Sequence, residues 1–386
     1  MAKKVSLNKF APVMISFYIM GFVDLVGVAT GYVQKDFALS DSVAQLLPSM
    51  VFIWFALLSI PTGIFQDRKS KKLTVSIGIF ITGIGLIIPF LAYNYISVII
   101  GFSLLGIGNT ILQVSANPLL IDISTKKTQS ANLSFSQFIK ASAALLSPIF
   151  IALLVRHFGD WKLIFPIYAI VSLLVAVWLF SLKIEEKVST KPPATFGSVL
   201  SLLKDKMVIV LIIGIFLIVG FDVGMNSNIA IFLTSRFQLD LATAGYGISV
   251  YFASLMVGRF SGGVLLRYTT ERTFILTSLV LTFLGLFGII FSPTITIAWV
   301  MIFLAGLGFS NIFPLLFSIS IDRRPEYANE ISGLIILAVS GGAVIPPIMG
   351  FVSQNFGEVA AILVLVGCML YVSYAAMYIL RKEPQE

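Results

Sequence analysis

The chain contains about twelve apolar runs, each about twenty residues long and separated from the next by a short polar segment. A helix of about twenty apolar residues is long enough to cross the hydrocarbon core of a bilayer. Of the 386 residues, 58% are hydrophobic and only 11% are charged. A water-soluble domain usually has roughly a quarter of its residues charged. We therefore predict an all-α polytopic membrane protein whose surface is completed by the lipid bilayer.

The expected spans follow the apolar runs. They are 11–34, 43–65, 73–93, 96–121, 131–155, 162–182, 207–233, 242–266, 272–292, 294–321, 329–354 and 359–380. The first run, Phe10 to Val33, has no small-residue cleavage site after a short apolar core. We therefore expect it to be retained as a membrane helix and not removed as a signal peptide.

Lysines and arginines in the polar segments indicate the orientation. With both termini inside, the cytoplasmic side holds Lys3, Lys4, Lys9, Arg68, Lys69, Lys71, Lys72, Lys126, Lys127, Lys183, Lys187, Lys191, Lys204, Lys206, Arg267, Arg272, Arg323, Arg324, Arg381 and Lys382. The other side holds only Lys35, Arg156, Lys162 and Arg236. Because cytoplasmic loops carry an excess of Lys and Arg, we expect a multi-pass protein of the bacterial inner (cytoplasmic) membrane with both termini cytoplasmic.

The longest polar gap, 183–206, contains a Ser-Thr-Lys-Pro-Pro-Ala stretch and lies near the middle of the chain. We therefore predict an N-terminal six-helix bundle at 1–182, a cytoplasmic linker at 183–206 and a C-terminal six-helix bundle at 207–386. An offset of 200 residues pairs Phe37, Leu39, Ala44, Ser49, Phe52, Gly63, Gly106, Gly108 and Asp122 with identical residues of the second half. Such duplication predicts two pseudo-symmetric bundles with a transport site between them, near the bilayer midplane.

Several function classes are disfavoured. One cysteine, Cys368, and one histidine, His157, leave no disulfide framework, zinc cluster or histidine-based catalytic set. The net charge of +8 comes from short gaps between apolar runs, which disfavours nucleic acid as a partner. A membrane-embedded enzyme or sensor would need a reactive cluster or a sizeable soluble domain. We expect no enzyme, no cofactor and no metal site.

Charged residues inside apolar runs are the first candidates for function, since a charge at the centre of a membrane helix costs roughly 2.5–3.5 kcal/mol. Asp24 and Asp222 lie near the middle of the first and seventh runs, and Lys140 lies well inside the fifth. We predict that these three residues couple cation movement to substrate binding. The alternative is that Lys140 pairs with an aspartate only to hold helices together.

Amides follow the same pattern in the fourth and fifth runs. Asn109, Gln113 and Asn117 recur at a spacing of four and therefore share a helix face. Gln137 and Lys140 are three apart and share another face. Polar residues on one face suit a cavity, or else hydrogen bonds that hold helices together. In the second half, the positions matching Gln137 and Lys140 are Ile336 and Val339, so the polar residues are concentrated in the first half.

Four charged residues near helix ends are predicted to act in gating. Arg259 is expected to pair with a helix-end acid such as Asp322, or to extend toward the inner surface. The Asp67-Arg68-Lys69 segment, with Gly63 ahead of it, resembles the loop signature between helices 2 and 3 of the major facilitators. The resemblance implies that an aspartate at this helix end closes an inner gate by pairing with a neighbouring helix.

Specific motifs resemble the fucose, glucose and galactose symporter family of the major facilitators. These motifs are GIGN-x-x-x-Q-x-x-ANP from Gly106, N-x-x-x-x-Q from Asn132, VGFDVGMNS, VGRFSGG and SGGAVIPPIMGFVS. The resemblance covers nearly the whole chain and implies the major facilitator fold with twelve transmembrane helices. It also implies uptake of a hexose, deoxyhexose or amino sugar driven by H⁺ or Na⁺, with Asp222 at a position that is commonly acidic in the family. We expect a monomer.

The chain departs from that family at two acidic positions. Gln113 stands where family symporters have an acid in the fourth helix, and Gly27 or Val28 stands where they have one in the first. We hypothesise that Asp24 and Lys140 replace them. The residues expected to bind the sugar hydroxyls are Asn109, Gln113, Gln137, Asn226 and Asn228. The aromatic residues expected to pack on the sugar ring are Tyr18, Trp54 and Tyr251.

Two other transport functions remain open. Lys140 could be the counter-ion of an anionic substrate such as a sugar acid or another carboxylate. The protein could also be an efflux carrier, since efflux carriers share the same fold.

Overall fold

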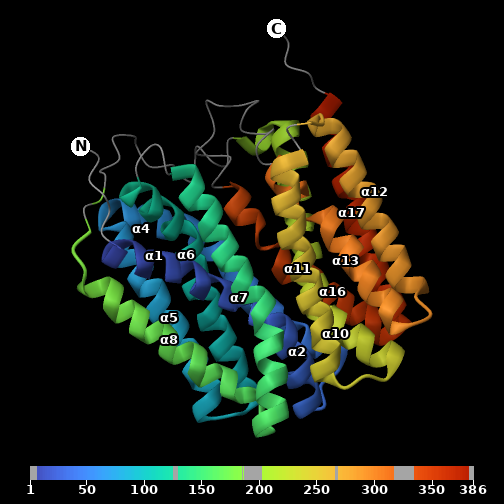
Figure 1. Ribbon diagram of the computed structural model, residues 1–386, viewed down its shortest axis with the longest axis horizontal. Coiled ribbons are helices and arrows are strands. Elements are labelled where there is room, and N and C mark those ends of the chain that lie inside the picture. The colour runs from blue at the N-terminus through green and yellow to red at the C-terminus, as the bar shows by residue number, and fades with distance from the viewer. Residues whose placement is uncertain are drawn as a thin grey trace. The chain divides into compact units, whose positions relative to one another are not determined.

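The computed structural model describes residues 7–124, 129–184, 186, 202–265, 268–316 and 334–381 (Figure 1). The helices are α1 (Leu7–Met20), η1 (Gly21–Asp24), α2 (Leu25–Asp36), α3 (Asp41–Ala44), α4 (Leu46–Arg68), α5 (Lys71–Leu91), α6 (Tyr95–Ile123), α7 (Gln129–Phe158), η2 (Trp161–Leu163), α8 (Ile164–Ser181), η3 (Leu202–Lys204), α10 (Lys206–Phe237), α11 (Leu241–Leu265), α12 (Glu271–Phe291), α13 (Ile295–Phe309), α16 (Gly341–Phe356) and α17 (Glu358–Arg381). The three labelled η are single 3₁₀ turns.

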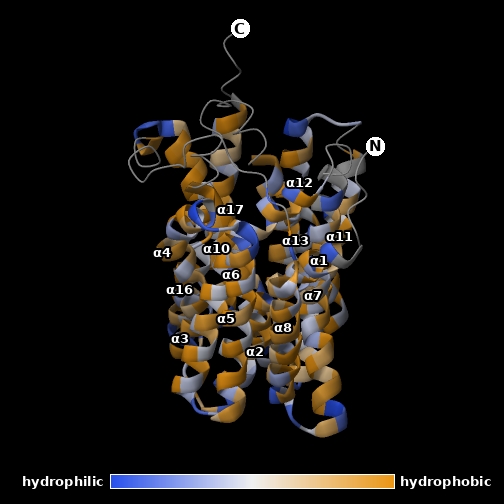
Figure 2. Ribbon diagram, turned by 90° about the vertical axis from the view of Figure 1, so that its left-hand side faces the viewer, coloured by the Kyte–Doolittle hydropathy of each residue, from blue (hydrophilic) through white to orange (hydrophobic). Residues whose placement is uncertain are grey.

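Within the described residues, 12 helical segments are long and apolar enough to cross a membrane, from Lys9–Asp36 to Glu358–Leu380. Their ends lie within a few residues of the expected spans, which confirms the all-α polytopic prediction. The first segment is built from α1, η1 and α2, and the second from α3 and α4. Figure 2 shows hydrophobic residues along the helix shafts and hydrophilic residues mainly near the helix ends.

The chain divides into two compact units, and the division does not follow the sequence order. Unit 1 comprises Met1–Val26 and Met50–Pro193, and unit 2 comprises Gly27–Ser49 and Ala194–Glu386. The end of the first membrane segment and the start of the second therefore belong to the unit built mostly from the C-terminal half. The predicted boundaries at 182 and 207 stay a prediction, because most of the expected linker lies outside the described residues.

Matching helix starts support the duplication. Ser70 accepts a hydrogen bond from the Leu73 amide at the start of α5, and Thr270 accepts one from the Thr273 amide at the start of α12. The same offset of 200 residues relates the caps of α6 and α13, in which Asn94 and Thr294 accept hydrogen bonds from amides three residues later. Because a side-chain cap fixes where a helix begins, the two halves set their helix starts in the same way.

Small residues hold corresponding helices together in each half. A Cβ added at Gly108 of α6 would collide with Thr82 and Gly78 of α5, and one at Gly308 of α13 would collide with Thr282 and Ser278 of α12. In unit 1, α5 packs against α6 and α8, and in unit 2, α12 packs against α13 and α17. Close backbone approach through small residues is typical of membrane helices, and here it repeats across the duplication.

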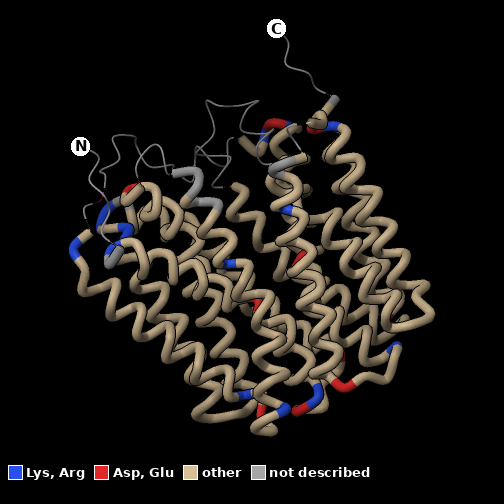
Figure 3. Tube along the Cα trace, in the orientation of Figure 1, with Lys and Arg blue, Asp and Glu red and all other residues tan. Residues whose placement is uncertain are grey.

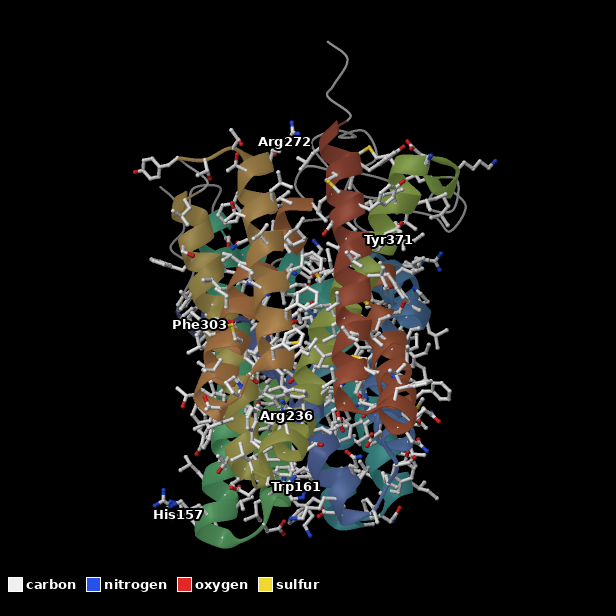
Figure 4. The ribbon with its side chains drawn as sticks, turned by 90° about the vertical axis from the view of Figure 1, so that its right-hand side faces the viewer. His157, Trp161, Arg236, Arg272, Phe303 and Tyr371 are labelled. Atoms are coloured by element: carbon white, nitrogen blue, oxygen red, sulfur yellow. The ribbon has the colours of Figure 1, made fainter. Side chains whose placement is uncertain are left out.

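Charged residues lie mostly near the helix ends, and few lie along the helix shafts (Figure 3). Within unit 2, Arg272 and Arg236 lie toward opposite ends of the helices (Figure 4). This is the separation expected if the two arginines lie on opposite sides of a membrane. The few charged residues away from the helix ends are the natural place to look for a functional site.

Candidate functional site

The first membrane segment changes its helical geometry at Asp24. This residue ends the 3₁₀ turn η1 between α1 and α2, and its side chain is half-buried. Gly21, at the start of the turn, lies so close to the Lys140 carbonyl oxygen and to Ala143 of α7 that a Cβ would not fit there. On another side, the Asn109 side chain of α6 donates a 2.6 Å hydrogen bond to the Met20 carbonyl oxygen. The turn carrying Asp24 is therefore held by α6 and α7.

Amide side chains extend from this turn along α6. Gln113 Nε2 lies 3.5 Å from Asn109 Oδ1, and Gln137 Nε2 of α7 lies 3.4 Å from Asn117 Oδ1. Asn109 is buried, Gln113 and Asn117 are half-buried, and Gln137 is exposed. The shared face expected from the spacing of four is therefore present, and α7 adds Gln137 to it. We call Asn109, Gln113, Asn117 and Gln137 the amide row.

Lys140 and the predicted aromatic residues of unit 1 are partly accessible. The side chains of Lys140, Tyr18 and Trp54 are all half-buried. Tyr18 packs edge-on against Phe22, with ring centroids 5.5 Å apart. The Trp54 indole Nε1 is buried and has no hydrogen-bond partner among the described residues.

In unit 2, the acid that corresponds to Asp24 is Asp222, and its hydrogen-bond partner is a tyrosine. The Tyr251 hydroxyl of α11 donates a 2.7 Å hydrogen bond to Asp222 Oδ1 of α10. Tyr251 is fully buried, at 0% exposure, and Gly306 of α13 packs directly against it. Asp222 is half-buried. The tyrosine ring is thus enclosed by its neighbours, and its hydroxyl orients a carboxylate.

The two predicted asparagines of α10 are buried. Asn228 Oδ1 accepts a 3.2 Å hydrogen bond from Gln45 Nε2, and Asn228 Nδ2 donates one of 3.0 Å to the Gly224 carbonyl oxygen. The Asn226 side chain fills the space next to Gly27, where any Cβ would collide with it. Gln45 was not among the predicted site residues. Its polarity within an apolar span was the available signal.

Hydrogen bonds join the segment Gly27–Ser49 to α16 within unit 2. Ser353 Oγ donates to Asp41 Oδ2 at 2.7 Å, and Ser42 Oγ donates to Gln354 Oε1 at 2.7 Å. Ser49 Oγ donates to the Ala343 carbonyl oxygen at 2.7 Å, and Gly350 approaches the Asp41 backbone too closely to admit a Cβ. We call this set of contacts the α3–α16 latch. Sequence reasoning did not identify it.

The predicted gating residues stay a prediction, because part of the set lies outside the described residues. Arg68 and Arg259 are exposed, and the Asp67 side chain and all of Asp322 lie outside the described residues. A different ion pair lies at the start of α5, where Lys71 Nζ is 2.6 Å from Asp122 Oδ2 of α6. The duplication had singled out Asp122 but not its partner.

The family of this protein follows from its fold and its sequence together. The sequence profile of the Major Facilitator Superfamily matches residues 13–347, most of the chain. The chain belongs to the major facilitator superfamily. This membership confirms the resemblance inferred from the motifs, and it identifies the chain as a transporter and not an enzyme.

Among the relatives of this major facilitator is a protein of Brucella abortus named glucose/galactose transporter. The two are 25% identical over 374 residues, which are 93% of this chain and 90% of the relative. The L-fucose-proton symporter of Escherichia coli is 21% identical over 363 residues, covering 84% of this chain and 82% of the symporter. A crystal structure of the E. coli fucose:proton symporter superposes with a TM-score of 0.70 at 19% identity, covering 97% and 99% of the two chains.

Proposed function

We propose that this major facilitator takes up a monosaccharide (a hexose, deoxyhexose or amino sugar) by symport with H⁺ or Na⁺ through alternating access. The amide row of α6 and α7 is the observation that carries the proposal. Amides both donate and accept hydrogen bonds, as sugar hydroxyls do, so a row of them suits a neutral polyol. The names of the relatives, glucose/galactose transporter and L-fucose-proton symporter, support the same substrate class.

In this proposal, Asp24 and Lys140 of unit 1 and Asp222 of unit 2 carry the coupling. Each is half-buried in a membrane-spanning helix, where a charge is retained at a cost of roughly 2.5–3.5 kcal/mol. Binding of a cation at an aspartate neutralises a charge that otherwise must be stabilised by its neighbours. The packing of Gly21 against the Lys140 backbone supports a coupling role for Asp24, because it fixes the turn that carries Asp24 on α7.

Substrate contacts are assigned to the amide row, to Asn226 and Asn228, and to an aromatic wall. Of the three predicted aromatic residues, Trp54 is the one that we favour, because it is half-buried and can offer the face of its large indole ring. Tyr18 is also half-buried and can contribute a ring face. Tyr251, whose hydroxyl bonds to Asp222, is better suited to positioning that acid.

The α3–α16 latch is proposed to close one side of the transport path and to release once in each cycle. Its contacts join two parts of unit 2, namely α16 and the segment Gly27–Ser49 of the first two membrane spans. The rest of those two spans belongs to unit 1. From the distribution of Lys and Arg, we place this latch on the outer side of the bacterial inner membrane and both termini in the cytoplasm. Gating by Asp67, Arg68, Arg259 and Asp322 is proposed on the opposite side.

The decisive experiment is uptake by purified protein in proteoliposomes. A panel of labelled hexoses, deoxyhexoses, amino sugars and sugar acids is offered while a pH gradient and a sodium gradient are imposed separately. The proposal predicts that one neutral sugar accumulates and that only one of the two gradients drives it. Accumulation of a sugar acid alone would instead support Lys140 as a counter-ion, and export with no uptake would support an efflux carrier.

A further inference from the structure

An apolar groove lies between α5 and α8 on the lipid-facing surface of unit 1. It encloses about 330 Å³ and is lined by Ser76, Ile77, Phe80, Ala176, Val177 and Phe180. Its floor is made of small residues and its walls of large ones, and Phe80, Val177 and Phe180 are 49%, 68% and 62% exposed. The one hydroxyl in the lining, that of Ser76, donates to the Lys72 carbonyl oxygen, so the lining offers no free polar group among the described residues.

A lysine lies at one end of this groove. Lys72 Nζ is 5.6 Å from the centroid of the Phe180 ring, so the ring that forms a wall also carries the cation. The ammonium group donates to the Phe180 and Leu182 carbonyl oxygens, at 3.0 and 2.8 Å. An ammonium group has three donors, and these bonds use two of them. Among the described residues, the third donor of this ammonium group at the end of the groove has no partner.

Among the described residues, the charged side chains next to Lys72 already have hydrogen-bond or ion-pair partners. The Glu186 carboxylate is engaged by the hydroxyl of Ser70 and by the backbone amides of Lys71 and Lys72, at the start of α5. Lys71 is paired with Asp122. Glu186 accepts hydrogen bonds from backbone donors and Asp122 neutralises Lys71. Within the part of the chain that the structure describes, the Lys72 ammonium group bonds only to carbonyl oxygens and to no carboxylate, so it can interact with a further anion.

We propose that the α5–α8 groove binds one anionic phospholipid, with an acyl chain along the apolar lining and the phosphate at Lys72. An apolar channel that ends at an ammonium group is complementary to a molecule with a long hydrocarbon chain and a phosphate at its end. Basic residues at a membrane surface attract anionic lipids in the same way. The inference rests on the membrane-spanning fold alone and is independent of the transported substrate.

The second half provides a natural comparison for this site. Arg272 and Leu276 of α12 lie 200 residues after Lys72 and Ser76 of α5, so a basic residue recurs but the small floor residue does not. Leu276 is 40% exposed and carries a bulky side chain where Ser76 leaves space. A lipid site that needs both the cation and the groove is therefore assigned to the first half only.

The test is native mass spectrometry of the purified full-length protein titrated with phosphatidylglycerol or with phosphatidylcholine. The wild type is expected to retain one phosphatidylglycerol more tightly than any phosphatidylcholine. Lys72→Gln is expected to weaken that retention about fivefold. Ser76→Leu, which copies the second half, is expected to reduce retention to a similar extent while leaving Lys72 in place.

Arg272→Gln is the matched control, since it removes a basic residue at the equivalent helix position without touching the groove. It is expected to retain phosphatidylglycerol as the wild type does. Equal retention of both lipids by the wild type would overturn the proposal, as would Lys72→Gln and Ser76→Leu both behaving like Arg272→Gln. Size-exclusion profiles establish that each variant is folded before the titration is interpreted.

Discussion

The two halves of the molecule share helix caps and glycine contacts but differ in the polar residues inside the membrane. Unit 1 has a charged turn at Asp24 followed by the amide row along α6 and α7. In unit 2 the α10 acid, Asp222, is bonded to a buried tyrosine, Tyr251. Gly106 and Gly306 occupy matching positions in the two halves. Gly106 packs against Val51, whereas Gly306 packs against Tyr251. The same scaffold position thus holds an apolar side chain in one half and an acid-orienting hydroxyl in the other.

The largest expected effect comes from removing the charge of unit 1 at Asp24. At 100 mV, a symporter moving one charge with each sugar supports about fiftyfold accumulation. Asp24→Asn is expected to abolish that accumulation, because the ionisable group that links ion and sugar is gone. Exchange of labelled for unlabelled sugar, which needs no net ion movement, should persist in the same proteoliposomes. An Asp24→Asn protein that still concentrates sugar would remove Asp24 from the coupling role.

A smaller effect is expected at the amide row. Gln137→Ala should raise the apparent KM for sugar about tenfold, since hydrogen bonds to the substrate are lost. Ile336→Ala, at the corresponding position of the second half, should leave the KM within about twofold. Initial rates measured across sugar concentrations give both values. Similar shifts for the two variants would mean that the halves contribute equally to binding.

The tyrosine of unit 2 gives a third comparison. Tyr251→Phe removes the hydrogen bond to Asp222 and should lower the rate of ion-driven uptake about fivefold, because the bond involves a carboxylate. Tyr168→Phe is the matched control, since the Tyr168 hydroxyl is also buried but lies 2.8 Å from the neutral Ser147 hydroxyl. It should leave uptake nearly unchanged. If both variants lose uptake to the same degree, the effect comes from packing and not from Asp222.

The smallest expected effect concerns helix caps at matched positions. Asp240 accepts a 3.0 Å hydrogen bond from the Thr243 amide, whereas Ser40, 200 residues earlier, makes no side-chain cap bond. Asp240→Ala should therefore lower the free energy of unfolding by up to about 1 kcal/mol, and Ser40→Ala should not change it. Thermal unfolding in detergent measures both. An equal loss in the two variants would show that the cap bond is not the cause.

The pH dependence of this cap has a defined sign. Hydrogen bonds from Thr243 lower the pKa of Asp240 below its ordinary value of 3.8. A lowered pKa in the folded state means that the carboxylate stabilises the fold above pH 3.8, and that this contribution is lost as the pH falls through the folded-state value. The difference between wild type and Asp240→Ala should therefore be constant near neutral pH and shrink below about pH 4. Asp240 is exposed, so solvent screening keeps the change small.

Much of the fold could be predicted from the sequence, because apolar length determines membrane spans and an offset of 200 residues reveals the duplication. The amide row was also accessible, since a spacing of four places side chains on one helix face. The partners that such residues bond to on other helices could not be predicted from the sequence. The hydrogen bond between Tyr251 and Asp222 joins residues of α10 and α11, and helical periodicity says which face a residue occupies but not what lies opposite.

Other features depended on the backbone itself. The 3₁₀ turn at Gly21–Asp24 has no proline that would mark it, so the first span was expected to be one continuous helix. The α3–α16 latch joins residues about 300 positions apart through serine, aspartate and glutamine side chains that look like ordinary loop residues in the sequence. Contacts at such separation arise from packing of whole helices and leave no local pattern.

The α3–α16 latch also has a consequence for biogenesis. Ser42 and Gln354, which it joins, are 312 residues apart, so the ribosome makes Ser42 long before it makes α16. The segment Gly27–Ser49 can therefore enter the bilayer well before α16, but it reaches its final neighbours only after α16 has been made. Gly350 of α16 lies against the Gln45 side chain, which is 1% exposed in the finished protein, so this polar side chain stays uncovered on that side until α16 has packed. Quality control of the nascent chain would therefore meet an unfinished polar surface around Gln45.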